Sequence, residues 1–380
     1  MRETVSIQYL RAVAATMVVV YHAMTRVGAP GAAEPFAVGF WASGVDVFFV
    51  VSGFIMWSTT AERRVSTRQF LTARFQRILP LYWTALAACW LVFAFDRGID
   101  GAPGALDVVR SALFIPYRDA TTGFVAPFLT PGWTLTYEMI FYAVFAVALV
   151  LEQKAARLAF VGVVFVAMTS LRFRWGSDDP IALRVTSPLF FEFLAGMAIA
   201  EIHRRLRDDR RAERVGYVAF GLAGLFIAFV AAPRFETLPR FVDFGVPAAL
   251  LVLGATALEG RIATRPIGWL KRLGDASYSL YLAHDIHLQI STPWLAASGW
   301  PAAVQMALHV AGSLVVGLVV YAAVERPLTV WVKTWVRARA PAAAPLAPIS
   351  VSSAPVAADT RPEIPAGAVT VAGTVPARRG

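Results

Sequence analysis

The sequence has a single cysteine, Cys89, among 380 residues. A lone cysteine excludes a disulfide framework and a metal site built from several thiolates. Charged residues are also scarce, at 16% of the chain, whereas hydrophobic residues make up 57% and the mean hydropathy is +0.59. That is far more apolar than an average soluble domain. The chain shows no glycine-rich phosphate loop and no long-period repeat. What it does have is a series of long apolar stretches, which predicts a polytopic membrane protein built of α-helices.

Ten apolar stretches predict membrane-spanning helices, with short charged gaps between them. They are residues 7–25, 38–58, 79–96, 133–151, 155–171, 186–202, 215–232, 241–258, 277–295 and 302–324. Residues 105–117 are too short and too charged to span, and we expect them at the membrane interface. The expected fold class is an all-α polytopic membrane protein of about ten transmembrane helices.

Lysine and arginine are distributed unevenly over the loops. With the N-terminus inside, the inner loops hold 17 of them and the outer loops hold 9. By the positive-inside rule, both termini are then cytoplasmic. The same bias accounts for much of the formal charge of +10, so nucleic-acid binding is not expected. Composition further predicts a transmembrane domain at 1–338 and a disordered Ala/Pro-rich cytoplasmic tail at 339–380.

Two ionisable residues, Arg11 and His22, interrupt the first apolar stretch. Such groups are costly inside a membrane and often functional. They are eleven residues apart, so a helix places them on nearly the same face, ~16 Å apart along its axis. Alone, Arg11 fits an interface anchor and His22 a packing residue. Their shared face favours an internal polar pathway with Arg11 nearer the cytoplasm.

Two acidic residues fall at about the expected depth of His22. Asp46 lies ~12 Å below the outer end of the second span, and Glu138 lies ~7 Å below Trp133 in the fourth. A histidine with a carboxylate neighbour is typical of a general base and its orienting group. We therefore predict His22, Glu138 and Asp46 as catalytic residues. The alternative is a structural cluster of buried polar groups.

Further polar residues lie where spans meet the cytoplasm. Arg74 and Arg77 share one helical face at the mouth of the third span. Such a pair can bind a phosphate through charge-assisted hydrogen bonds, although the positive-inside bias alone also accounts for it. Glu325 ends the tenth span, and we interpret it as a stop signal with a local ion pair and no chemistry.

The ninth span begins with a polar stripe. Ser277, Tyr281 and His284 are spaced by four and three residues, which puts them on one face. We expect them to line a pore or to contact a substrate. His284 and His287 lack a third ligand at a suitable spacing, so we predict no metal site.

In order and spacing, these segments resemble the acyltransferase 3 family of integral-membrane O-acyltransferases, and its exopolysaccharide-acetylating branch in particular. The resemblance covers residue 7 to about residue 328. It is carried by the stretches LRAVAATMVVVYH, GVDVFFVVSGF, RFQRILPLYW, GWTLTYEMIFY, LGDASYSLYLAH and VERP.

The resemblance implies transfer of an acyl group, usually acetyl from acetyl-CoA, to a hydroxyl of a glycan outside or crossing the membrane. In the family, the histidine of the Arg-x10-His motif is held to be essential, and an Arg-x-x-Arg motif is assigned to acyl-CoA. The matching residues are Arg11 and His22 for the first motif, Arg74 and Arg77 for the second, and Trp133, Thr134 (usually serine) and Glu138 for a Gly-Trp-Ser-x-x-x-Glu stretch.

From this resemblance we expect acyl-CoA as a co-substrate, held by Arg11, Arg74 and Arg77, and no bound cofactor. Trp133, Ser277, Tyr281 and His284 are expected to contact substrates. We hypothesise that His22 takes a proton from a sugar hydroxyl, which attacks the thioester carbonyl. Glu138 or Asp46 would orient the imidazole. A covalent acyl-histidine is the less favoured variant.

Two other functions use similar features. A transporter or a translocase of lipid-linked sugars also buries proton-relaying groups, but should show paired repeats or broken spans. A structural subunit of a polysaccharide assembly complex needs no such histidine. The expected location is the bacterial inner membrane. The expected partners are the lipid bilayer, a glycan acceptor, acyl-CoA and proteins of polysaccharide biosynthesis.

Overall fold

The computed structural model describes residues 4–28, 35–98, 101–119, 123–175, 178–206, 209, 211–231 and 238–339. Those residues are mostly helical, and the β structure among them is an isolated bridge between Arg118 and Val125. The predicted all-α class is therefore confirmed. The described helices fall in the unit Met1–Ala338, except for the last residue of the final helix. From position 340 on, the predicted tail lies outside the described residues.

The longer helices follow the predicted spans in order. They are α1 (Val5–Val27), α3 (Gly44–Thr60), α4 (Thr67–Arg97), α6 (Gly132–Ala148), α7 (Lys154–Ser170), α10 (Phe190–Leu206), α11 (Ala212–Val230), α13 (Gly245–Ala257), α16 (Ser277–Ala297) and α17 (Ala302–Val320). The shorter ones are α2 (Pro35–Ala42), α5 (Ala105–Ala112), α8 (Arg172–Trp175), α9 (Pro180–Val185), α12 (Arg240–Asp243), α14 (Glu259–Ile262) and α15 (Gly268–Asp275). A π-helical turn, η2 (Tyr321–Glu325), joins α17 to α18 (Arg326–Arg339).

Seven helical stretches of the described chain are long and apolar enough to cross a membrane. They are Val5–Val27, Val38–Thr60, Thr67–Asp96, Pro180–Leu206, Ala212–Val230, Arg240–Ala257 and Ala302–Val336. These match seven of the predicted spans, so the protein is a multi-pass membrane protein. The other three fall on α6 and α7, which have 17 residues each, and on α16, whose polar residues lower its hydropathy. The count of ten and the cytoplasmic placement of both termini stay predictions.

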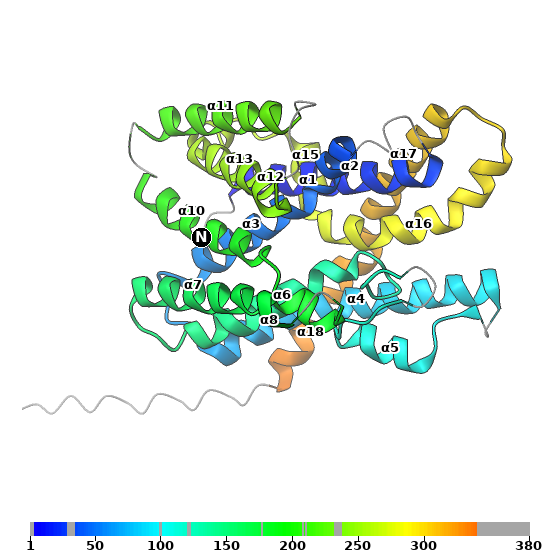
Figure 1. Cartoon of the computed structure of the whole chain (residues 1–380), viewed down its shortest axis with the longest axis horizontal. Helices are drawn as coiled ribbons and strands as arrows, with labels where there is room; N and C mark the ends of the chain where they lie inside the picture. Colours follow the sequence, from blue (N-terminus) through cyan, green and yellow to red (C-terminus); the bar gives the residue numbers. More distant parts are fainter. Residues whose placement is uncertain are drawn as a thin grey trace, which may run out of the picture. The chain divides into compact units, whose positions relative to one another are not determined.

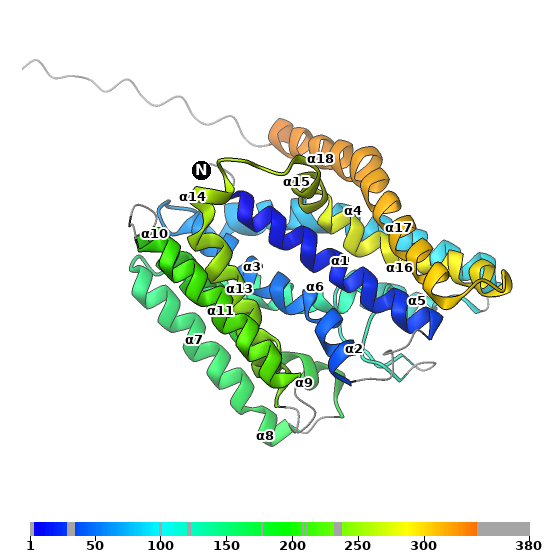
Figure 2. The same ribbon diagram turned by 90° about the horizontal axis from the view of Figure 1, so that it is seen from above.

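Helix α1 lies at the centre of the part of the fold that forms the site. It packs against α3 and α13 on one side and against α15, α16 and α17 on the other (Figure 1, Figure 2). Four of these packing partners, α13, α15, α16 and α17, lie more than 200 positions later in the sequence.

Helices α3 and α10 approach each other closely through two glycines. A Cβ added to Gly53 would lie 2.0 Å from the Phe193 carbonyl oxygen, and one added to Gly196 would lie 1.9 Å from the Val50 carbonyl oxygen. Small residues let transmembrane helices pack backbone against backbone. This contact fixes the position of α3, whose opposite face lines the site.

A cluster of aromatic rings packs α3, α6, α7 and α10 together. The Phe49 and Phe193 ring centroids are 4.7 Å apart, and those of Phe141 and Phe193 are 4.5 Å apart. The Phe165 and Phe190 rings stack at 5.0 Å. Such pairs contribute about 0.5–1.5 kcal/mol each beyond the burial of their area. They make this side of the bundle a rigid wall for the site.

Candidate active site

A cavity of about 570 Å³ lies among α1, α3, α4, α6, α16 and α18, and we call it the central cavity. This volume is within the range of about 300–1,000 Å³ that is usual for small-molecule sites. Its apolar wall includes Phe48 and Phe49 from α3. Its ionisable lining residues are Arg11, Arg74, Arg77, Glu138, Tyr142, Tyr278, Tyr281 and Lys333.

The structure brings the three predicted acyl-CoA-binding arginines together in the lining of this cavity. Arg74 and Arg77 share a face of α4, which begins with a capping box between Ser66 and Gln69. The Arg74 Nε atom is buried without a hydrogen-bond partner in the described chain. The Arg11 Nη1 atom donates to Gln8 Oε1 at 3.0 Å. The cluster thus offers unpaired N–H donors to an anion.

Arg77 has a fixed partner that the sequence analysis missed. Its guanidinium pairs with Glu325, which is 2% exposed and also accepts a hydrogen bond from Ser279 Oγ at 2.5 Å. The expected local ion pair of Glu325 is therefore wrong, because its partner lies 248 positions earlier. Glu325 is the last residue of η2, and π-helical turns often mark functional sites.

Glu138 lies with the arginines rather than with the histidine. Its Oε2 atom accepts a hydrogen bond from the Tyr142 hydroxyl at 2.9 Å. It lines the same cavity as Arg74, Arg77 and Arg11. The structure therefore places Glu138 in the central cavity, and no hydrogen bond among the described residues joins it to His22.

Asp46 is held elsewhere. It is 0% exposed and pairs with Arg240, whose Nη2 donates to Asp46 Oδ2 at 2.7 Å and whose Nε donates to Oδ1 at 3.3 Å. Buried Glu192 interacts with the same pair. The expectation that Asp46 orients His22 is not met. The sequence predicted how deep Asp46 lies along α3 but not which way its side chain points about the helix axis. The neighbouring residues Val45 and Phe48 line the cavity instead.

His22 lies outside the cavity lining, in a row of rings that leads to it. Its ring centroid is 5.1 Å from that of His284, which in turn is 6.0 Å from that of Tyr281. Tyr281 lines the cavity, and its hydroxyl contacts Thr134 Oγ1 at 2.9 Å and donates to the Pro131 carbonyl oxygen at 3.2 Å. His284 is fully buried, and its Nδ1 atom lies 3.1 Å from the Leu280 carbonyl oxygen. The predicted residues Tyr281 and His284 thus connect the cavity to His22.

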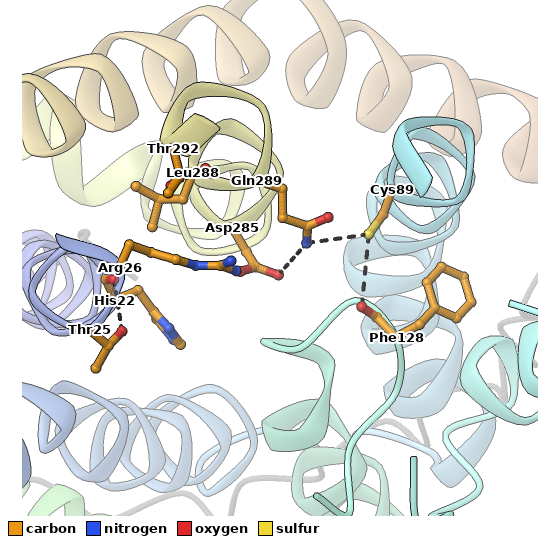
Figure 3. A network of polar contacts seen from close by, with 9 residues as sticks. All are labelled: His22, Thr25, Arg26, Cys89, Phe128, Asp285, Leu288, Gln289 and Thr292. Atoms are coloured by element: carbon orange, nitrogen blue, oxygen red, sulfur yellow. Dashed lines mark hydrogen bonds and ion pairs between the residues drawn. The ribbon is translucent and has the colours of Figure 1, made fainter. Parts of the chain in front are cut away.

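A further buried carboxylate, Asp285, directly follows His284 on α16, and the sequence analysis did not single it out. Asp285 is 1% exposed, and its Oδ1 atom pairs with Arg26 Nη2 at 3.4 Å (Figure 3). Gln289 Nε2 donates to Asp285 Oδ2 at 3.1 Å and to the Cys89 sulfur at 3.9 Å. The signal was present in the sequence as an Asp that directly follows His284 inside an apolar span.

The remaining predicted residues are divided between the cavity and its surroundings. Ser277 lines the cavity with a buried hydroxyl that has no partner among the described residues. Trp133 lies outside it and faces the Arg184 guanidinium, whose carbon is 5.0 Å from the ring centroid. The described residues contain no group of three His, Cys, Asp or Glu side chains arranged to hold a metal ion.

Comparison with known proteins gives a consistent result. A family profile described as an acyltransferase domain matches residues 4–326. The chain is 35% identical to the exopolysaccharide production protein ExoZ of Rhizobium meliloti over 311 residues, which is 81% of this chain and 93% of that protein. It is 25% identical to the peptidoglycan O-acetyltransferase OatA of Listeria monocytogenes, covering 85% of this chain but 55% of OatA. It is 29% identical to an O-acetyl transferase of Shigella phage Sf6, covering 50% of this chain and 61% of that protein. No solved structure matches.

Proposed function

The chain belongs to the acyltransferase domain family, and from this premise we propose that it transfers an acyl group, acetyl in the simplest case, from cytoplasmic acyl-CoA to a hydroxyl of an exported polysaccharide. That it is a membrane acyltransferase follows from the family and from the apolar helices. The donor, the acceptor and the residue roles are the proposal. The names of ExoZ and OatA, an exopolysaccharide production protein and a peptidoglycan O-acetyltransferase, support a polysaccharide acceptor. The charge pattern and the bacterial relatives support a bacterial inner membrane.

The observation that carries this proposal is the form of the central cavity. Arg74, Arg77 and Lys333 lie in its lining on helical segments that the charge pattern makes cytoplasmic, and Tyr281, in the same lining, comes three residues before His284 on α16. The phosphates of CoA are anionic, and arginine binds phosphate with charge-assisted hydrogen bonds. A CoA held there extends its thiol arm along the cavity and brings the acyl carbon toward Tyr281, His284 and His22.

His22 acts as the general base in this proposal. It takes the proton of the acceptor hydroxyl while the oxygen attacks the thioester carbonyl, and the C–S bond then breaks with the electron pair on sulfur. In place of Glu138 and Asp46, the carboxylate that acts on the histidines is Asp285, which is paired with Arg26 and stabilises positive charge on the neighbouring His284 ring. Glu138 instead holds Tyr142 and faces the arginines.

The test uses membrane vesicles that contain the protein, acetyl-CoA labelled in the acetyl group, and the polysaccharide of the host. Label should enter the polysaccharide with the wild type and with His203→Ala. This variant is a matched control, because His203 lies on α10, where it hydrogen-bonds the Thr256 carbonyl oxygen. It should not enter with His22→Ala that accumulates to the same level. Label transfer by that variant contradicts the role of His22.

The same experiment separates transfer from transport. If the polysaccharide or its lipid-linked precursor crosses the membrane in a His22-dependent way while no label reaches it, the protein is a transporter and the proposed donor is wrong.

A further inference from the structure

Four of the five histidines of the chain gather between three neighbouring helices. His22 belongs to α1, His284 and His287 belong to α16, and His309 belongs to α17. These three helices pack pairwise against one another. The fifth histidine, His203, is on α10. We call the four residues and the two serines beside them, Ser291 and Ser313, the histidine seam.

Two ring-to-ring contacts on neighbouring helices make up the seam. The centroids of His22 and His284 are 5.1 Å apart, and those of His287 and His309 are 6.4 Å apart. His284 and His287 are i and i+3 on one helix, so their side chains are neighbours. A Cβ added to Gly312 of α17 would lie 2.5 Å from His287 Nε2, so this ring is packed tightly against α17.

The polar atoms of the seam are buried and incompletely paired. Among the described residues, the Nε2 atoms of His284, His287 and His309 and the Oγ atom of Ser313 have no hydrogen-bond partner. In the part of the chain that the structure describes, His309 Nδ1 is the one seam nitrogen with a side-chain partner, Ser291 Oγ at 3.0 Å. Buried polar atoms without partners are costly, and water between helices is their ordinary partner. Apolar residues would pack these helices at a lower free-energy cost, so packing alone does not explain why histidines occupy these positions.

Two other uses of the seam fit less well. Among the described residues, no third side chain joins two of these histidines in an arrangement that could hold a metal ion. None of the four histidines lines the central cavity, so they do not hold the donor. The charged groups near the seam are Arg26 and Asp285, which are paired with each other. Imidazoles that are close to one another and flanked by a neutral ion pair are suited to passing a proton.

We infer that His284, His287 and His309 form a proton relay that carries the proton of His22 toward the α16–α17 connection, near Ala297 and Ala302. This inference rests on the proposed function. During transfer the acceptor oxygen bonds to the acyl carbon, its proton goes to His22, and the C–S bond breaks. The thiolate takes a proton from cytoplasmic water. His22 must then lose one proton per turnover, and the relay releases it on the side where the charge pattern places this connection, which is the non-cytoplasmic side of the membrane.

The relay has a measurable consequence. Each acyl transfer consumes one cytoplasmic proton and releases one on the acceptor side. If His22 returned its proton directly to the thiolate, no proton would change sides. The purified full-length protein is placed in liposomes that contain the acceptor polysaccharide and a pH-sensitive dye. Acetyl-CoA is added outside, which selects molecules whose cytoplasmic face points outward.

The wild type should acidify the lumen by one proton for each ester formed. His309→Ala should form ester at least tenfold more slowly, and added imidazole should restore much of the rate, which a purely structural role would not allow. His309→Gln, which keeps a polar side chain for Ser291, tests the same point where the alanine variant does not fold. His203→Ala should behave as the wild type, with or without imidazole.

Ester formation by the wild type without acidification overturns the relay and leaves the proposed function standing. A wild-type rate for both His309 variants also overturns it. If the wild type forms no ester with any host polysaccharide, the proposed function fails and the relay fails with it.

Discussion

Arg74 and Arg77 lie one turn apart on α4, yet replacing each by alanine should impair different properties of the protein. Arg74 makes no ion pair in the described chain, and its Nε is unpartnered. Arg77 is paired with the buried carboxylate of Glu325. Arg74→Ala should therefore weaken the binding of acyl-CoA and leave folding intact, whereas Arg77→Ala should also destabilise the fold.

The magnitudes follow from these contacts. A hydrogen bond to a charged group contributes about 1.5–3 kcal/mol, so the dissociation constant of acetyl-CoA should rise about 10- to 100-fold in Arg74→Ala. Removal of one partner of a buried ion pair costs about 3–5 kcal/mol. The Arg77 side chain is 35% exposed, and solvent screening reduces the expected loss of unfolding free energy in Arg77→Ala to about 2–3 kcal/mol.

The assay is equilibrium binding of acetyl-CoA to the detergent-solubilised protein, with thermal unfolding measured on the same samples. Arg68→Ala is the matched control, because it removes the same charge from an exposed position of α4 outside the cavity lining. Equal affinity of Arg74→Ala and Arg68→Ala for acetyl-CoA would refute the assignment of the cavity to the donor. An unfolding midpoint of Arg77→Ala equal to that of Arg74→Ala would refute the structural weight given to Glu325.

Three further predictions use other contacts. Gly196→Ala should prevent stable accumulation, because its Cβ meets the Val50 carbonyl oxygen, whereas Gly221→Ala on open α11 should not; equal yields after detergent extraction would contradict the backbone contact. Asp285→Asn keeps an acceptor for Gln289 but loses the ion pair with Arg26, so kcat should fall about 10-fold at an unchanged KM for acyl-CoA; an unchanged kcat would remove Asp285 from the site. Tyr281→Phe loses two hydrogen bonds of a buried hydroxyl, and we expect a loss of about 1–2 kcal/mol in thermal unfolding with a lower kcat; unaltered values of both would show that the hydroxyl is dispensable.

The sequence predicted how deep a residue lies along its helix better than it predicted which way the side chain points about the helix axis. Hydropathy located seven spans that the structure confirms, and the family resemblance grouped Arg11, Arg74 and Arg77, which line one cavity. The spans were predictable because burial in lipid acts on each segment separately.

The contacts that depend on which helices are neighbours were not predictable in the same way. Asp46 and Glu138 were assigned to His22 by depth, but Asp46 faces Arg240 and Glu138 faces the arginines. The pairing of Arg77 with Glu325 joins residues 248 positions apart. Such contacts depend on how each helix is rotated about its axis relative to its neighbours, and the sequence of one span alone does not determine that rotation.

The position of the lone cysteine gives the protein a natural reporter. The Cys89 thiol is fully buried, contacts Gln289 and lies 3.9 Å from the Phe128 carbonyl oxygen, so it is the point where α4 meets the Asp285 network (Figure 3). A thiol reagent adds one adduct per molecule, and it does so when the packing of α16 and the Phe128 segment around Cys89 opens. The labelling rate of the unmodified chain therefore measures how often the contact between α4 and α16 opens at Cys89. A change in this rate on adding acyl-CoA or acceptor measures how far each substrate keeps that contact closed.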